Sequence, residues 1–525
     1  MITLKKSLHF AILTTGFALI AQAGWSQNTS TAETALLFSR STSGGSARVR
    51  AMGGAQVALG GDFSSATSNP AGLGMFNRSE FTISPWINGA TNDATYLDKS
   101  TSATRSRIAI PAFSIVFHAD KDKGNLISGN FAISFNRLND YNRTYSYEAT
   151  NPTTSIIDYF IQDAYGTDYR DLLSGGSYAE SPTGLAFSSY LIDTLATNSP
   201  AYISALGTNF NDPAATRSQL QHEDIKFSGA QNQWSFSYGV NLGDKIYLGG
   251  GLGVRMVEFQ SHKTYTESNF QFALDPNYKP VTRFSLDEQL HTSSSFGING
   301  TLGLIYRPID VIQVGLSYTT PTSLQMTDIY NASMNTDWNN FYYYGPNTTP
   351  LNNIVVQTQD VVSHYRLKTP SRMAVGATGF IQKYGLITGE VELVNYANSN
   401  YKSKDTGVSY DQDNRNIASS FVSAVNYRLG GELRLQSFRL RGGYSYMADP
   451  YKTTHDTDRS IQTVSGGAGY RTAGFYVDIT VMSSSTRSLY NPYKTVNYLT
   501  LQDNSPVVNS RSSNLTFMVT LGFPF

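Results

Sequence analysis

The stretch SARVRAMGGAQVALGGDFSSATSNPAGLGMF, residues 46–76, decides how the rest of the chain is read. It is rich in Gly, Ala and Ser, so its backbone can turn tightly and pass close to other backbones. Its large apolar residues are too few to build a core of their own. Because the chain from Phe81 to Phe525 reads as a long series of β-strands, we interpret residues 33–77 as a hatch packed inside a barrel.

The strands are indicated by fourteen segments in which apolar and polar residues alternate with a period of two. In the third segment, for example, Phe131, Ile133 and Phe135 share one face. Strands of soluble β-sandwiches also alternate apolar and polar residues, so this pattern does not distinguish a sandwich from a membrane barrel. The lengths of the connections do. Short and long connections follow one another strictly, which is typical of an outer-membrane barrel with tight periplasmic turns and long outer loops.

The connections support an all-β fold, a 14-stranded antiparallel transmembrane barrel over residues 78–525. The predicted short links are at about 119–124, 242–245, 307–310, 382–385, 434–437 and 471–474, and the predicted long polar links are at about 92–106, 142–229, 264–289, 320–361, 398–417, 448–460 and 487–511.

Both ends of the chain carry signals of export. Residues 1–23 combine two lysines, a short apolar stretch and a small-x-small site, which predicts a cleaved signal peptide. Residues 24–77 then form the N-terminal extension and hatch. The last strand alternates up to the aromatic carboxy-terminus Phe525, as in strands that the barrel-assembly machinery of the outer membrane recognises. The chain contains no cysteine, which excludes disulfides and thiol chemistry.

The hatch also carries a family resemblance. The run Ala47–Ala58, followed by Asp62, by Asn69, Pro70, Ala71 and Gly72, and by Phe76, resembles the N-terminal hatch of the FadL family. Members of that family are outer-membrane transporters of long-chain fatty acids and other hydrophobic molecules. The segments 368–380 and 385–393 also look like mid-barrel strands of the family.

The resemblance implies a route for the ligand. A fatty-acid-like or aromatic hydrocarbon molecule would be captured among the outer loops, pass to a pocket beside the hatch and leave sideways through a gap in the wall. Gly129 interrupts the third strand and Pro111 removes a ladder donor from the second, so either residue can mark a bulge or that gap. A glycine that merely accommodates packing is the alternative.

Charged residues of the hatch need partners if it fills the lumen. Arg48, Arg50 and Asp62 are the hatch charges. The inward-facing candidates on the wall, by strand parity, are Glu390, Glu392, Arg439, Arg441 and Asp478. The alternative is that these groups only hydrate the lumen.

The longest loop, 142–229, contains apolar residues whose spacing fits short amphipathic helices. An exposed apolar surface there would be a first landing place for an apolar ligand. Packing of the loop on itself is the alternative. The insertion lies earlier in the chain than the groove expected from the family pattern.

The sequence indicates no catalytic constellation, metal site or cofactor, so we predict that the protein is not an enzyme. The zero net charge argues against nucleic-acid binding. The expected partners are a hydrophobic small molecule, outer-membrane lipid and the barrel-assembly machinery. The competing hypothesis is a surface receptor or adhesin that binds haem or a protein through its long loops.

Overall fold

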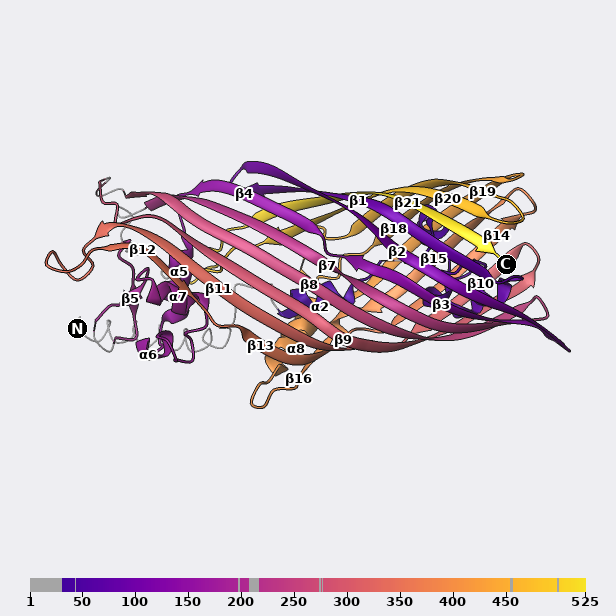
Figure 1. Ribbon diagram of the computed structural model, residues 1–525, viewed down its shortest axis with the longest axis horizontal. Coiled ribbons are helices and arrows are strands. Elements are labelled where there is room, and N and C mark those ends of the chain that lie inside the picture. The colour runs from indigo at the N-terminus through magenta and orange to yellow at the C-terminus, as the bar shows by residue number, and fades with distance from the viewer. Residues whose placement is uncertain are drawn as a thin grey trace.

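The computed structural model describes residues 31–525 except 43, 197–198, 207–216, 273–274, 276, 454–456 and 498–499. The predicted signal peptide, residues 1–23, and residues 24–30 lie outside the described residues. The chain forms one closed antiparallel barrel (Figure 1), with short turns gathered at the end that holds the carboxy-terminus. Helices α5 (Ile156–Ala164) and α7 (Pro182–Ser188) lie at the other end.

The wall contains fourteen strands, which confirms the predicted fold class. In chain order they are β1 (Glu80–Tyr96), β2 (Lys99–Lys123), β3 (Leu126–Asp140) followed by β4 (Arg143–Asn151), β7 (Arg217–Leu242), β8 (Ile246–Phe272), β9 (Val281–Ile309), β10 (Ile312–Thr319) continued by β11 (Ser323–Phe341), β13 (Val361–Lys368) continued by β14 (Arg372–Ile381), β15 (Gly385–Asn395) followed by β16 (Asn400–Ser403), β17 (Ser423–Leu435), β18 (Phe438–Met447), β19 (Ile461–Arg471), β20 (Tyr476–Tyr490) and β21 (Val508–Pro524).

The first and last wall strands pair and close the barrel. The ladder between β1 and β21 runs from Glu80 opposite Pro524 to Tyr96 opposite Val508. The amide of Phe525 adds one more bond, 2.9 Å to the carbonyl oxygen of Ser79. Closure matters because a free strand edge cannot be hydrated inside a lipid bilayer. Among the described residues, no helix is both long and apolar enough to cross a membrane.

An apolar band surrounds the part of the barrel near the short turns. Its outward side chains include Leu302 on β9, Leu429 on β17 and Phe438 on β18, all more than half exposed. Inward positions of the same strands include the buried polar residues Thr301 on β9, Asn426 on β17 and Arg441 on β18. Exposed apolar side chains outside and polar ones inside are the arrangement expected of a barrel in lipid.

Several strands extend far beyond this band on the side of the long loops. β7, β8 and β9 have 26, 27 and 29 residues, whereas about 9–11 residues suffice to cross a bilayer. The predicted long polar links at 92–106, 264–289 and 320–361 are therefore wrong over much of their length. Outward residues beyond the lipid need not be apolar, so the alternation that marks a membrane strand is lost there.

The first outer connection shows this most clearly. Instead of a long link over residues 92–106, β1 and β2 continue to a two-residue turn at Leu97 and Asp98, which have φ of 44° and 64°. Positive φ at both positions is typical of a tight hairpin turn. The longest connection narrows to residues 152–216, because β4 and β7 occupy both ends of the predicted segment 142–229.

The remaining elements belong to the outer connections, and one of them, β12, pairs with β11 and extends the wall. They are α5 (Ile156–Ala164), α6 (Tyr169–Leu172), α7 (Pro182–Ser188), β5 (Asp193–Thr194), β6 (Tyr202–Ile203), β12 (Leu351–Gln357), η3 (Tyr396–Asn398) and α8 (Asp411–Ser420). The apolar faces of α5 and α7 are buried against inward side chains of β8, β9 and β11, such as Phe284 and Met334. We call residues 152–206 the cap.

The N-terminal segment, residues 31–76, lies within the wall. It comprises α2 (Thr31–Ser39), α3 (Ala47–Ala51), α4 (Ser65–Ser68) and η1 (Pro70–Met75). Helix α3 contacts β18 to β21, whereas η1 contacts β3, β7, β8 and β9 on other parts of the wall. A segment that touches strands around the circumference is enclosed by them, and its apolar residues Val49, Phe63 and Leu73 are fully buried.

Glycines on the inner wall allow the backbone of this segment to approach. A Cβ added at Gly443 would lie 2.1 Å from the amide nitrogen of Gly53 and 2.2 Å from the carbonyl carbon of Met52. A Cβ at Gly315 would lie 2.1 Å from the carbonyl oxygen of Val57. Backbone atoms cannot move aside as a flexible side chain does, so these wall positions require glycine.

The Gly443→Val substitution should therefore displace the N-terminal segment from the wall. The neighbouring Gly442→Val variant is the matched control, because Gly442 has open space around it. We expect trypsin to cleave after Arg48 or Arg50 in the folded Gly443 variant, and we expect both sites to be protected in wild type and in the Gly442 variant. Equal protection of all three proteins would contradict the close approach.

Candidate functional site

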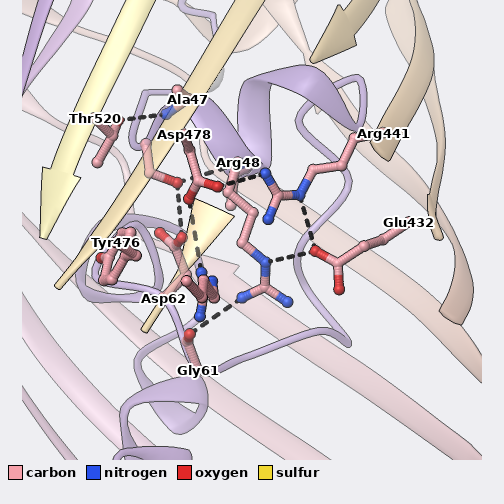
Figure 2. Close-up of polar contacts among 12 residues, drawn as sticks. Ala47, Arg48, Gly61, Asp62, Glu432, Arg441, Tyr476, Asp478 and Thr520 are labelled. Atoms are coloured by element: carbon pink, nitrogen blue, oxygen red, sulfur yellow. Dashed lines mark hydrogen bonds and ion pairs between the residues drawn. The ribbon is translucent and has the colours of Figure 1, made fainter. Parts of the chain in front are cut away.

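A chain of charged side chains joins the N-terminal segment to the wall (Figure 2). Arg48 of α3 donates from Nε to Glu432 of β17 at 3.3 Å, and Glu432 also accepts from Arg441 of β18 at 2.8 Å. Arg441 donates from Nη1 to Asp478 of β20 at 2.6 Å. All four side chains are buried, so each charge depends on its neighbours rather than on water.

Backbone contacts support this charged chain. The amide of Ala47 donates to Thr520 Oγ1 at 2.7 Å (Figure 2). Its carbonyl oxygen accepts from Thr480 Oγ1 at 2.8 Å. Arg48 also donates to the carbonyl oxygen of Gly61 at 3.2 Å. Helix α3 is thus tied to the wall at its start and to the following loop of its own segment.

A second charged group lies on the adjacent part of the wall. Glu390 of β15 accepts from the amides of Gln56 and Val57 at 2.9 and 3.0 Å. Arg428 of β17 pairs with Glu390 and, at 3.2 Å, with Glu392. Glu392 also pairs with Arg372, at 3.2 Å. These side chains line a cavity of about 90 Å³ between the segment and the wall, together with Arg255 of β8 and several hydroxyl groups.

The other predicted hatch charges have different surroundings. Asp62 lies inside the segment and accepts from the hydroxyls of Ser46 and Ser64 at 2.7 and 2.6 Å. Arg50 is buried, with its guanidinium carbon 5.1 Å from the ring centre of Trp86. Arg439 lies beside the β17–β18 turn and donates to carbonyl oxygens of that turn.

The Asn69-Pro70-Ala71-Gly72 motif forms a turn that seats the segment on the wall. Asn69 caps η1 by accepting from the amide of Ala71 at 3.2 Å, and its Nδ2 donates to the carbonyl oxygen of Val57 at 2.6 Å. Proline at the first helical position suits this role, because its missing N–H would have no intrahelical partner. The turn packs on Gly249 of β8, whose added Cβ would lie 2.2 Å from the carbonyl carbon of Pro70.

The wall has a seam between its second and third strands. The β2–β3 ladder ends where Ala112 faces Asn136. In the described part of the chain, no ladder joins residues 99–111 to β3 or β4, and these residues pair only with β1. Pro111 lies where the seam begins, beside a β-bulge. Gly129 lies nearer the short β2–β3 turn and is paired on both sides, with Ala119 of β2 and with Val240 of β7.

The seam exists because β4 leaves the wall and folds inward. β4 keeps its ladder to β7, from Arg143 opposite Phe227. On its other side it packs on the inner faces of β1 and β21: Asn92 Nδ2 donates to the carbonyl oxygen of Thr144 at 2.9 Å, and the hydroxyl of Tyr145 lies 3.0 Å from that of Ser512. β2 therefore keeps an unpaired edge above Pro111.

A hollow of about 400 Å³ lies at this unpaired edge. Its lining is polar and comes from three wall strands, β2, β7 and β8, and the β3–β4 junction: Arg105, Ser106, Arg107, Asn142, Ser228, Gly229, Glu258 and Gln260. We call it the seam hollow. Arg105 reaches across it and donates from Nη1 to the carbonyl oxygen of Phe227 at 2.8 Å.

A buried carboxylate fixes the cap to the wall. Glu267 of β8 accepts from the hydroxyl of Ser155 at 2.5 Å and from the amide of Ile156 at 2.9 Å. Ser155 is the N-cap residue of α5, and Ile156 is its first helical residue. A negative charge at a helix N-terminus is stabilised by the helix dipole. Burial raises the pKa of Glu267. Arg217 of β7 adds an ion pair to Asp158 of α5, at 2.7 Å.

A second buried carboxylate, Glu223 of β7, lies where β4 and β20 meet. It accepts from the hydroxyls of Tyr147 and Tyr490 at 2.7 and 2.9 Å. Burial raises the pKa of Glu223 to about 7, against the attraction of Lys263. This carboxylate lies beyond the apolar band, on the side of the cap.

Sequence reasoning missed the central wall residues of both charged groups, Glu432 and Arg428. Both are inward-facing by the parity that identified Glu390 and Arg441, so the signal was present in the alternation of β17. In the described residues, no cluster of three or more His, Asp or Glu side chains is placed to hold a metal ion.

Removing the carboxylate that joins Arg48 to Arg441 should loosen the N-terminal segment. Glu432→Gln leaves three arginines without their shared partner, so we expect the free energy of unfolding to fall by about 3 kcal/mol or more. Urea unfolding in lipid vesicles measures it. Arg434→Gln is the control, because Arg434 is 30% exposed and its pair with Glu432 is worth less than about 1 kcal/mol. Equal loss in both variants would contradict the coupling.

Glu223 should make the stability depend on pH. Its pKa is raised on folding, so the stabilisation from its protonated form is complete below pH ~4.5, the pKa of an unfolded glutamate, and is lost as the pH rises to about 7. Between these limits we expect wild type to lose roughly 3 kcal/mol more stability than Glu223→Gln, at 1.36 kcal/mol per pH unit. Urea unfolding at pH 4.5 and 7.5 tests this, and parallel pH profiles would refute it.

Comparison with known proteins places this arrangement among solved barrels. No protein-family model and no curated protein matches the sequence. A FadL homologue from Pseudomonas aeruginosa aligns over 92% of this chain and 99% of its own, with a TM-score of 0.55 and 12% identity. The toluene transporter TbuX from Ralstonia pickettii aligns over 92% of this chain and 99% of its own, with a TM-score of 0.48 and 13% identity. On the first of these matches, the chain has the fold of a FadL homologue, a closed 14-stranded barrel whose N-terminal region can form a plug.

Proposed function

We propose that the protein is a passive outer-membrane transporter of hydrophobic molecules, in which residues 33–77 act as a hatch. The FadL-type fold supports the outer-membrane location, as do the apolar band and the predicted export signals at both ends of the chain. The molecule would be exported through a cleaved signal peptide and assembled by the barrel-assembly machinery. No energy source or cofactor enters this proposal.

The observation that carries the proposal is the seam between β2 and the strands that follow it. A molecule entering from the cap side meets a lumen occupied by the N-terminal segment, so a direct path along the barrel axis is blocked. At the seam, the wall lacks its ladder from Pro111 outward. Two of the most exposed apolar side chains of β2, Ile108 and Ile110, lie on the outer face of this edge.

These two features together support lateral release. A hydrophobic ligand gains free energy on passing from the lumen to lipid, at about 25 cal/mol per Å² of apolar surface removed from water. An opening at the edge of the apolar band allows that passage without moving the whole N-terminal segment. The charges that hold the segment would then tune how far it shifts.

Capture at the outer surface is the first step of the proposed route. Most apolar side chains of the cap are buried in its own core, which favours self-packing for residues such as Ile156 and Phe160. Leu173, Leu195 and Ile203 stay exposed and provide a first contact for an apolar molecule.

Reversible crosslinking of the seam tests lateral release. The chain contains no cysteine, so Arg105→Cys with Asn142→Cys places a thiol on each side of the seam hollow. After joining the thiols with a reducible bifunctional reagent, we expect uptake of radiolabelled oleate or dodecane by cells to fall at least tenfold and to recover on reduction. The control pair is Ile115→Cys with Ile133→Cys, which already face one another in the β2–β3 ladder.

The outcomes separate the parts of the proposal. If uptake is unchanged after the seam is crosslinked, lateral release does not occur at this place, but the protein can still be a transporter. A wild-type protein that carries neither compound, yet binds haem or a protein through its loops, would favour the receptor alternative.

A further inference from the structure

The seam hollow lies at the height where the apolar band ends. On β2, the outward residues change from Ile110 and Ile108 to Ser106 within a few positions, and Ser106 lines the hollow. On β8, Glu258 and Gln260 are exposed beyond the last outward apolar residues and also line it. The hollow therefore opens outward at the level of lipid headgroups, on the side of the long loops.

The charge of this hollow is mainly positive. Arg105 and Arg107 alternate with Ser106 along the free edge of β2, so they leave the strand on its inner face and border the hollow from that side. Arg105 is partly engaged by the carbonyl oxygen of Phe227, whereas Arg107 has no hydrogen bond or ion pair with the described residues. The carboxylate of the lining, Glu258, lies 2.6 Å from His291 Nε2. Two guanidinium groups thus face one carboxylate that already has a neighbour.

We propose that the seam hollow binds the phosphate headgroup of an outer-leaflet lipid, with the acyl chains lying over Ile108 and Ile110. A guanidinium presents a planar fork of donors that matches phosphate oxygens bidentately. The unpaired edge of β2 adds backbone N–H groups close to the same place. Ile108 is 75% exposed and Ile110 49%, which leaves apolar surface next to the charged site for an acyl chain.

The position of the site favours a lipid over the transported molecule. The hollow is polar, so a hydrocarbon gains nothing there, and its exposed residues Ser106, Glu258 and Gln260 open it to the outside. Outer-leaflet lipid is present at this height at all times. Binding there would cover the unpaired edge of β2 above the band.

Native mass spectrometry of the purified full-length protein tests the site, with lipid A, which carries two phosphates, as the probe. We expect Arg107→Gln to weaken lipid A binding at least tenfold, and Arg105→Gln with Arg107→Gln to weaken it further. Lipid A without its phosphates should bind wild type as weakly as the variants bind the intact lipid. Arg107 has no described protein partner to lose, so the single variant stays informative if the double variant fails to fold.

The matched control is Arg366→Gln with Lys368→Gln. These residues are likewise two apart on one wall strand, β13, and both are exposed. We expect this variant to bind lipid A as wild type does. Heat-modifiable migration in gels confirms that each variant is folded.

Three results would overturn the proposal. They are equal affinity of wild type and the Arg107 variant for lipid A, binding that is unchanged when the phosphates are removed, and Arg107-dependent binding of oleate or inorganic phosphate in place of lipid A. The seam crosslinking experiment measures uptake instead, so either proposal can fail without the other.

Discussion

Every backbone N–H and C=O group at the level of the apolar band needs a partner within the protein, because lipid supplies none. The β1–β21 ladder meets this requirement, and with it the number of strands and the width of the lumen are set. The requirement ends where the lipid ends. Above Pro111 the edge of β2 is unpaired. Ile110 and Ile108 still face outward at the start of this edge, and from Ser106 onward the outward residues are polar, so that water or headgroups can bind the free backbone groups there.

The lumen of a closed fourteen-stranded barrel is wide, and here the N-terminal segment occupies it. Contact with this segment determines which residues stand at many positions of the inner wall. Where the N-terminal backbone comes closest, the wall has glycine, as at Gly315 and Gly443. Where the segment needs orientation, the wall supplies charge, as at Glu432 and Glu390. The segment has too few apolar residues for a core of its own, so the wall completes it.

The sequence predicts the features that depend on local pattern. Alternation within strands, the short turns and the glycine-rich segment before the first strand give the barrel, its strand number and the segment inside it. The long outer extensions are missed because residues such as Thr91 and Thr104 face water, where no apolar alternation is required. Arg439 shares the parity of Arg441, yet β18 has only ten residues and Arg439 stands next to its turn. The seam depends on β4 crossing the inner face of distant strands, and no local pattern encodes that crossing.

The inward course of β4 has a consequence for biogenesis. Its side chains Tyr147 and Ala149 pack with residues of both β1 and β21, the first and last strands of the wall to be synthesised. The surface that receives β4 does not exist until those two strands meet. The cap that follows β4 in the chain can therefore reach its final position only after the barrel has closed, although its residues leave the ribosome long before β21. Protection of the cap from proteases would thus report completed insertion rather than the progress of synthesis.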